Sequence, residues 1–123
     1  MDSTDAPHRG EVWLVSHGAG KAGAPGKTRP AVIVSVDALS SGASRELIVV
    51  VPLSSSSAPS ALRVEIEQGA GAECASRAIC RAVRAVVRSR IVHPIGRVTS
   101  AELEQIDSAL SLILGLDRGP GPR

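Results

Sequence analysis

Residues 47–52 read LIVVVP, an unbroken apolar run dominated by β-branched side chains. The run is too short for an ordinary helix, and Ile and Val pack well on a pleated surface, so it predicts a fully buried central strand. Proline lacks the N–H that a sheet ladder needs, and we therefore expect this strand to stop at Pro52.

Other strands are expected on both sides of this run in the sequence. Residues 9–17 (RGEVWLVSH), 31–36 (AVIVSV) and 62–67 (LRVEIE) are apolar or alternate between apolar and polar side chains. Pro30 fixes its own φ and disfavours helix at Arg29. The second of these strands should therefore start at Pro30, with Arg29 directly before its first residue. Residues 18–27 (GAGKAGAPGK) predict a mobile, basic loop.

The C-terminal part of the domain predicts an amphipathic helix. Thr99 and Glu102 have the spacing of a capping box, and Gly115 stands where the helix would end. Apolar side chains recur between them at helical spacing, at Leu103, Ile106, Leu110 and Ile113. Residues 76–90 are ambiguous, because arginines recur there at helical intervals while the valines favour a strand, and periodicity alone favours a helix.

The 123 residues suit one domain whose core consists of branched aliphatic side chains, because Trp13 is the only aromatic residue. We expect a disordered lead-in at residues 1–8, a domain at residues 9–116 and a flexible Gly/Pro tail at residues 117–123. No apolar stretch approaches the roughly 20 residues that span a bilayer, and residues 1–7 lack an export signal. A cytoplasmic protein without membrane contact is therefore expected.

Cys74 and Cys80 are the only cysteines, and no histidines cluster with them. The sequence therefore predicts neither a disulfide framework nor a zinc site, and we expect both thiols to be buried and reduced. A phosphate-binding P-loop and a nucleophile elbow are also missing. No metal and no other cofactor is expected.

The formal net charge of +2 is only mildly basic, but its distribution is uneven. No Asp or Glu occurs between Glu73 and Glu102, whereas this interval contains Arg77, Arg81, Arg84, Arg88, Arg90 and Arg97. Solvated surfaces usually interleave both signs, so an anion-binding face is slightly favoured over an ordinary surface. Elsewhere, Lys27 and Arg29 share one face of an extended chain, and Ser54 and Ser55 follow a strand, a combination that suits phosphate.

Five segments, in this order and spacing, resemble the MazF/PemK toxins of type II toxin-antitoxin systems. They read RGEVWLV (9–15), PGKTRPAVIVS (25–35), LIVVVPLSS (47–55), CRAVRAVVRSRI (80–91) and IGRVTSAELEQIDSALSLILGL (95–116). The resemblance implies a mainly β fold with α, an SH3-like bent β-sheet barrel with a C-terminal helix. It also implies strand structure for residues 76–87, a homodimer, and a MazE-like antitoxin through which the toxin-antitoxin complex binds operator DNA.

The resemblance also implies an endoribonuclease that needs no metal, with Arg29 and Ser54 as its catalytic pair. In this chemistry the 2′-OH of RNA attacks the neighbouring phosphate, and Arg29 would hold the developing negative charge. Arginine keeps its proton in proteins and makes a poor base. His17 is a candidate proton acceptor because imidazole titrates near neutral pH, although a strand-end histidine is more often only solvated. RNA contacts are expected from Lys27, Ser55, Arg81 and Arg84.

Three departures from the family pattern are visible. Ser54 stands where Thr is more usual, which keeps the hydroxyl and loses a methyl group. The glutamate that many members carry before the Arg-Pro pair is absent, since Gly23, Ala24 and Pro25 occupy that region. Arg81 and Ala82 replace an acidic residue followed by Gln, so we expect a more cationic groove and a different target sequence. The choice among mRNA, tRNA and rRNA stays open.

Two other classes of function compete with the nuclease. CcdB-like toxins have a similar fold and poison gyrase by binding, but they need a tryptophan near the C-terminus, and residues 114–123 (LGLDRGPGPR) contain no aromatic residue. A catalytically silent nucleic-acid-binding module would need only the basic surface. Cleavage of labelled RNA separates the three.

Overall fold

The computed structural model describes residues 6–16, 27–39, 43, 45–55, 62–67 and 76–116. Its strands form one seven-stranded sheet in the order β4-β5-β3-β2-β1-β7, and β6 pairs with β3 beside this path. The strands are β1 (Glu11–Ser16), β2 (Thr28–Ile33), β3 (Leu47–Ser54), β4 (Arg63–Ile66), β5 (Ser76–Ile79), β6 (Arg84–Val87) and β7 (Ile91–Arg97). Three short 3-10 turns, η2 (Asp37–Leu39), η3 (Cys80–Ala82) and η4 (Arg88–Arg90), and one helix, α1 (Ser100–Leu114), complete the described structure.

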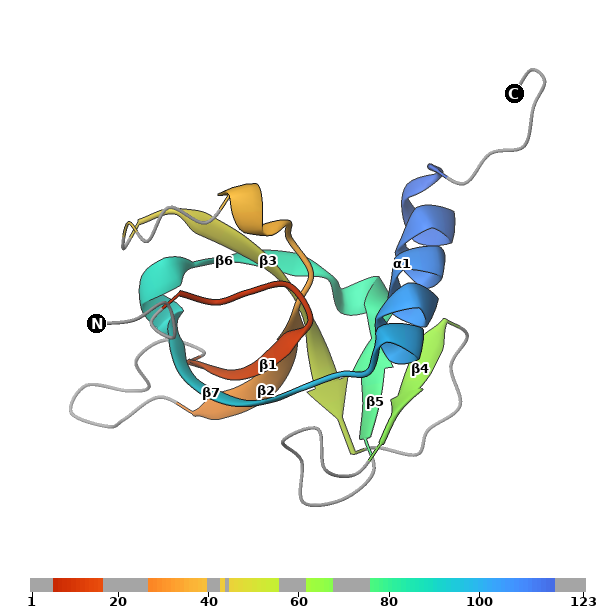
Figure 1. Cartoon of the computed structure of the whole chain (residues 1–123), viewed down its shortest axis with the longest axis horizontal. Helices are drawn as coiled ribbons and strands as arrows, with labels where there is room; N and C mark the ends of the chain where they lie inside the picture. Colours follow the sequence, from red (N-terminus) through yellow and green to blue (C-terminus); the bar gives the residue numbers. More distant parts are fainter. Residues whose placement is uncertain are drawn as a thin grey trace.

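The sheet is strongly curled, and α1 lies along one side of it beside β4 and β5 (Figure 1). Every pair of neighbouring strands is antiparallel. This architecture confirms the predicted fold class, mainly β with a single C-terminal helix. None of the helices in the described ranges is long and apolar enough to cross a membrane.

Strand β3 is the central strand that its sequence predicts, because its alternate side chains enter two different cores. Val51 and Leu53 lie in the core on the helix side. Ile48 and Val50 lie in a second core on the other side of the sheet, together with Trp13 of β1. A strand that is covered on both faces needs apolar residues at every position, which explains the unbroken run.

The prediction that this strand stops at Pro52 is wrong, because β3 continues to Ser54. Residues 47–50 of β3 pair with β6, and Leu53 and Ser54 pair with β5. Pro52 lies in the interval between these two ladders, where its missing N–H interrupts neither of them.

Strand β2 also begins earlier than predicted, at Thr28 and not at Pro30. The neighbouring strand β1 extends far enough to pair with these additional residues, Ser16 with Thr28 and Val15 with Arg29. Arg29 is therefore the second residue of a strand and not the residue before it. Pairing with β1 fixes its backbone in the extended conformation.

The ambiguous segment at residues 76–90 contains strands, as the family resemblance implies, and the helical interpretation of its periodicity is wrong. Strands β5 and β6 are separated by the 3-10 turn η3. The turn inserts three residues between two alternating patterns, and this spaces the arginines as they would be in a helix. Cys80, in η3, is fully buried and outside any disulfide, and burial raises the pKa of its thiol. Cys74 lies outside the described residues.

Helix α1 begins and ends as its sequence predicts. The Thr99 hydroxyl accepts a hydrogen bond from the Glu102 backbone N–H (3.0 Å), and Glu102 Oε1 accepts one from the Thr99 N–H (2.9 Å). Gly115 ends the helix with a left-handed φ of 72°, which glycine adopts without strain. Glu102 Oε2 also accepts a hydrogen bond from the backbone N–H of Glu67 (2.7 Å), which ties the start of α1 to the end of β4.

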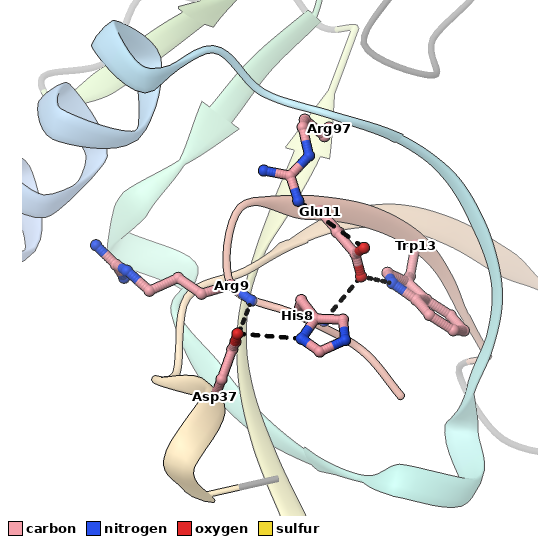
Figure 2. A network of polar contacts seen from close by, with 6 residues as sticks. All are labelled: His8, Arg9, Glu11, Trp13, Asp37 and Arg97. Atoms are coloured by element: carbon pink, nitrogen blue, oxygen red, sulfur yellow. Dashed lines mark hydrogen bonds and ion pairs between the residues drawn. The ribbon is translucent and has the colours of Figure 1, made fainter. Parts of the chain in front are cut away.

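The chain before β1 contributes to the domain, including two residues of the stretch expected as a disordered lead-in. Pro7 is among the fully buried side chains. His8 Nδ1 lies 3.0 Å from Asp37 Oδ2, and the Arg9 N–H donates to Asp37 Oδ1 at 2.7 Å (Figure 2). The His8 backbone N–H and Trp13 Nε1 both donate to Glu11 Oε1, at 2.8 and 2.9 Å. These contacts fasten the N-terminal segment to η2 and to β1.

We predict that this fastening weakens in acid. The Arg9 backbone N–H, and then the His8 side chain, lower the pKa of Asp37 below its ordinary value. A carboxyl whose pKa is lowered by folding stabilises the fold above its unfolded pKa and loses that contribution as the pH falls through the folded one. Asp37→Asn should therefore lose about 2 °C less in Tm than the wild type between about pH 5 and about pH 3. Identical losses in the two proteins would show that Asp37 carries no such coupling.

Candidate functional site

Arg29 and Ser54 lie just beyond the same end of the ladder between β2 and β3. The last pair of that ladder joins Ala31 to Pro52. Beyond it β2 stays paired with β1, where Arg29 lies opposite Val15, and β3 pairs with β5, where Ser54 lies opposite Arg77. The two predicted catalytic residues therefore flank the point at which the sheet divides.

Strand alternation gives both residues the same face of the sheet. Arg29 is in phase with Ala31 and Ile33, which lie in the second core, on the side away from α1. Ser54 is in phase with Val50 of the same core. Arg29 is exposed and Ser54 is half-buried, so both residues reach the surface of this face.

Two charged residues that the sequence did not assign to the site lie in line with Ser54. Arg77 of β5 pairs with Ser54 on one side and with Glu65 of β4 on the other. Arg77 Nε lies 2.7 Å from Glu65 Oε2. In the sequence, Arg77 lies in the interval without Asp or Glu, and Glu65 lies in a segment that alternates between apolar and polar residues. Only the register of the sheet places them next to Ser54.

The other predicted site residues lie at different distances from Arg29 and Ser54. Lys27 directly precedes β2, Ser55 directly follows β3, and both are exposed. Arg84 opens β6 opposite Val50. Val50 is four residues from Ser54 along β3, roughly 13 Å at a rise of about 3.3 Å per residue.

Arg81 is exposed in η3, the turn that packs against α1, so it is not brought to the pair. His17 lies outside the described residues. Within the described ranges, the His, Cys, Asp and Glu side chains form no group of three that could hold a metal ion.

A groove between α1 and β4 is separate from this surface. It encloses about 490 Å³ and is lined by residues that include Leu62, Arg63, Ala109 and Leu112. None of the predicted site residues within the described structure lines it. The candidate site is therefore an open surface that carries guanidinium and hydroxyl groups, which together suit a phosphate diester.

Comparison with known proteins supplies the family. Residues 8–114 match the model of a family described as PemK-like, MazF-like toxin of type II toxin-antitoxin system. The chain belongs to this toxin family. The toxin is 36% identical over 115 residues to Endoribonuclease MazF9 of Mycobacterium tuberculosis (strain ATCC 25618 / H37Rv), an alignment that covers 88% of the toxin and 96% of that protein. The predicted family is confirmed.

Solved structures agree on the fold. An endoribonuclease in complex with its cognate antitoxin, from a mycobacterial species, superposes on the toxin with a TM-score of 0.73 at 24% identity, covering 95% of the toxin and 100% of that chain. The Mycobacterium tuberculosis toxin MazF-mt6 superposes with a TM-score of 0.72 at 15% identity, covering 88% of the toxin and 99% of that chain. At these identities the likeness concerns the fold.

Proposed function

We propose that the toxin is a metal-independent endoribonuclease in which Arg29 and Ser54 form the catalytic pair. One observation carries the proposal: the two residues flank the end of the β2–β3 ladder and share one face of the sheet. The relative from Mycobacterium tuberculosis is named an endoribonuclease, which agrees with this activity.

The proposed reaction needs no group beyond the RNA and the protein. The 2′-oxygen forms a bond to phosphorus, the bond from phosphorus to the 5′-oxygen breaks, and the products carry a 2′,3′-cyclic phosphate and a 5′-OH. Arg29 binds the non-bridging oxygens with its planar guanidinium as charge develops there, and the Ser54 hydroxyl donates a hydrogen bond to the same phosphate. A base takes the 2′-proton, and an acid returns a proton to the leaving oxygen. His17, next to Ser16 at the end of β1, is our candidate for the base.

The surroundings of the pair suggest how RNA is held. Lys27 and Ser55 adjoin the pair along the chain and would contact the same stretch of backbone. Arg84, on the same sheet, and Arg81, in η3, would contact phosphates further along. With one aromatic residue, which is buried, base stacking has little part in binding, so single-stranded RNA or RNA loops would be held mainly through the backbone.

The family to which the toxin belongs suggests which partners it has. We propose that the toxin acts in the cytoplasm as a homodimer, that cleavage of mRNA, tRNA or rRNA blocks translation and growth, and that a MazE-like antitoxin neutralises it. A solved relative is named as an endoribonuclease in complex with its cognate antitoxin, which supports this last point. Binding of the complex to operator DNA would then run through the antitoxin.

The test uses purified toxin, labelled single-stranded RNA and an excess of EDTA. We expect cleavage to continue in the chelator and to leave 5′-OH ends. A substrate with one 2′-deoxy sugar on the 5′ side of the cut should bind and stay intact, because the attacking oxygen is missing. Loss of cleavage in EDTA that magnesium or zinc restores would refute the mechanism, and inhibition of gyrase without RNA cleavage would favour a CcdB-like function.

A further inference from the structure

A row of polar side chains crosses three strands on the face away from α1. Ser54 of β3, Arg77 of β5 and Glu65 of β4 are register partners in that order. Their chain neighbours Leu53, Ala78 and Val64 are buried in the core on the helix side, so alternation turns all three residues of the row the other way. Partners directly opposite each other in an antiparallel sheet have Cβ atoms about 4.5–5.5 Å apart, which puts Arg77 next to Ser54.

Glu65 fixes the direction of the Arg77 side chain. The contact from Arg77 Nε to Glu65 Oε2 is 2.7 Å, and β4 lies on the side of β5 opposite β3. The guanidinium group is therefore drawn one strand further from Ser54. The two side chains are 29% and 69% exposed, and an ion pair at such exposure contributes little to stability. Its relevance here is geometric, because it shows where the planar cation of Arg77 lies on this face.

We propose that Arg77, oriented by Glu65, binds the phosphate next to the one that is cut and so positions the RNA strand across Ser54. The sheet order β5-β3-β2 puts Arg77 and Arg29 on opposite sides of Ser54's strand. RNA carries one phosphate per nucleotide, so a strand that crosses these three β-strands meets a cation on each side of the hydroxyl. Glu65 lies on the edge strand β4, so its negative charge ends the row of phosphate-binding residues formed by Arg29, Ser54 and Arg77. The inference rests on the proposed nuclease function.

The first experiment measures binding of the uncleavable 2′-deoxy RNA as a function of salt. Each phosphate contact on single-stranded nucleic acid contributes about 0.7 to the slope of log affinity against log salt, so Arg77→Ala should flatten the slope by about that amount. Arg77→Lys should keep it. The control is Arg45→Ala, which removes an exposed arginine just before β3, at the opposite end of that strand from Ser54 and outside the interval without Asp or Glu. The control should leave the slope unchanged, and thermal melts should show all variants folded.

The second experiment locates the phosphate. A neutral methylphosphonate placed next to the cut should weaken binding of the wild type but have little effect on Arg77→Ala, and the same group further away should affect both proteins equally. In cleavage assays Arg77→Ala should raise KM and change kcat little, because a contact made equally before and during the reaction supplies binding.

Two failures are distinguishable. If the wild type cuts RNA but Arg77→Ala matches it in salt slope and in its response to the methylphosphonate, Arg77 has no role in positioning and the nuclease proposal stands. If the wild type binds the RNA and never cuts it, the proposed function is wrong, and the binding measurements still report whether Arg77 contacts phosphate.

Discussion

Arg29→Ala should lower the rate constant for RNA cleavage by about 10²- to 10³-fold, the usual effect of removing one preorganised donor to a developing negative charge. Ser54→Ala should cost less, about fivefold at most, because a neutral hydrogen bond typically supplies about 1 kcal/mol and water can partly replace the hydroxyl. The difference follows from charge, since only Arg29 opposes the charge that accumulates on the phosphate.

Single-turnover cleavage on a gel, with a thermal melt of each protein, measures both effects. Arg29 is exposed and Ser54 is half-buried at the end of a strand, so neither substitution should change stability much. Arg45→Ala is the matched control, because Arg45 is an exposed arginine just before β3, at the opposite end of that strand from Ser54. Full activity in a folded Arg29→Ala protein would exclude the proposed pair.

Glu102→Ala should have the largest effect on stability outside the apolar core, a loss of about 3 kcal/mol in the free energy of unfolding. Glu102 is 6% exposed, and its carboxylate accepts hydrogen bonds from two backbone N–H groups, those of Thr99 and Glu67. Alanine removes the side-chain half of the capping box and leaves the Thr99 and Glu67 N–H groups without their acceptor. Glu102→Gln keeps an oxygen for one of them and should cost less.

Chemical denaturation of the variants tests this prediction. Glu104→Ala is the control, because Glu104 is an exposed glutamate on the same helix, and it should change stability by less than about 0.5 kcal/mol. Equal losses for the two alanine variants would show that the link between α1 and β4 contributes nothing. Cleavage per folded molecule should stay at the wild-type value, since α1 lies on the face opposite the row of Ser54, Arg77 and Glu65.

The features predicted well from sequence are those that depend on neighbouring residues. The run LIVVVP predicted a strand covered on both faces, and Thr99, Glu102 and Gly115 predicted both ends of the helix, because capping is a matter of spacing over a few residues. The errors arose where pairing with distant segments of the chain decides where a strand ends. Pro52 is tolerated because β3 changes neighbours around it, and a change of neighbour leaves no mark on the strand's own sequence.

In the candidate site, too, some residues could be predicted from the sequence and others could not. The residues alone indicated cations beside hydroxyls, and the resemblance to the toxin family selected Arg29 and Ser54 among them. Arg77 and Glu65 could not be assigned to the site, because a shift of one residue in the pairing of β5 would turn Arg77 to the other face of the sheet, away from Ser54 and Glu65. The sequence of β5, four residues long, does not fix that register.

The pairing of β1 with β7 has a consequence for how the toxin is made. The ladder from Glu11–Arg97 to Val15–Ile91 joins segments separated by most of the domain. A chain leaving the ribosome presents β1 first, and at about 5–20 residues per second its partner follows roughly 4–15 s later. Until then Val15, the β1 neighbour of Arg29, lacks the strand that covers its other side. The order of the strands along the chain therefore leaves β1, the strand that pairs with Arg29, uncovered on its other edge until β7 has been synthesised.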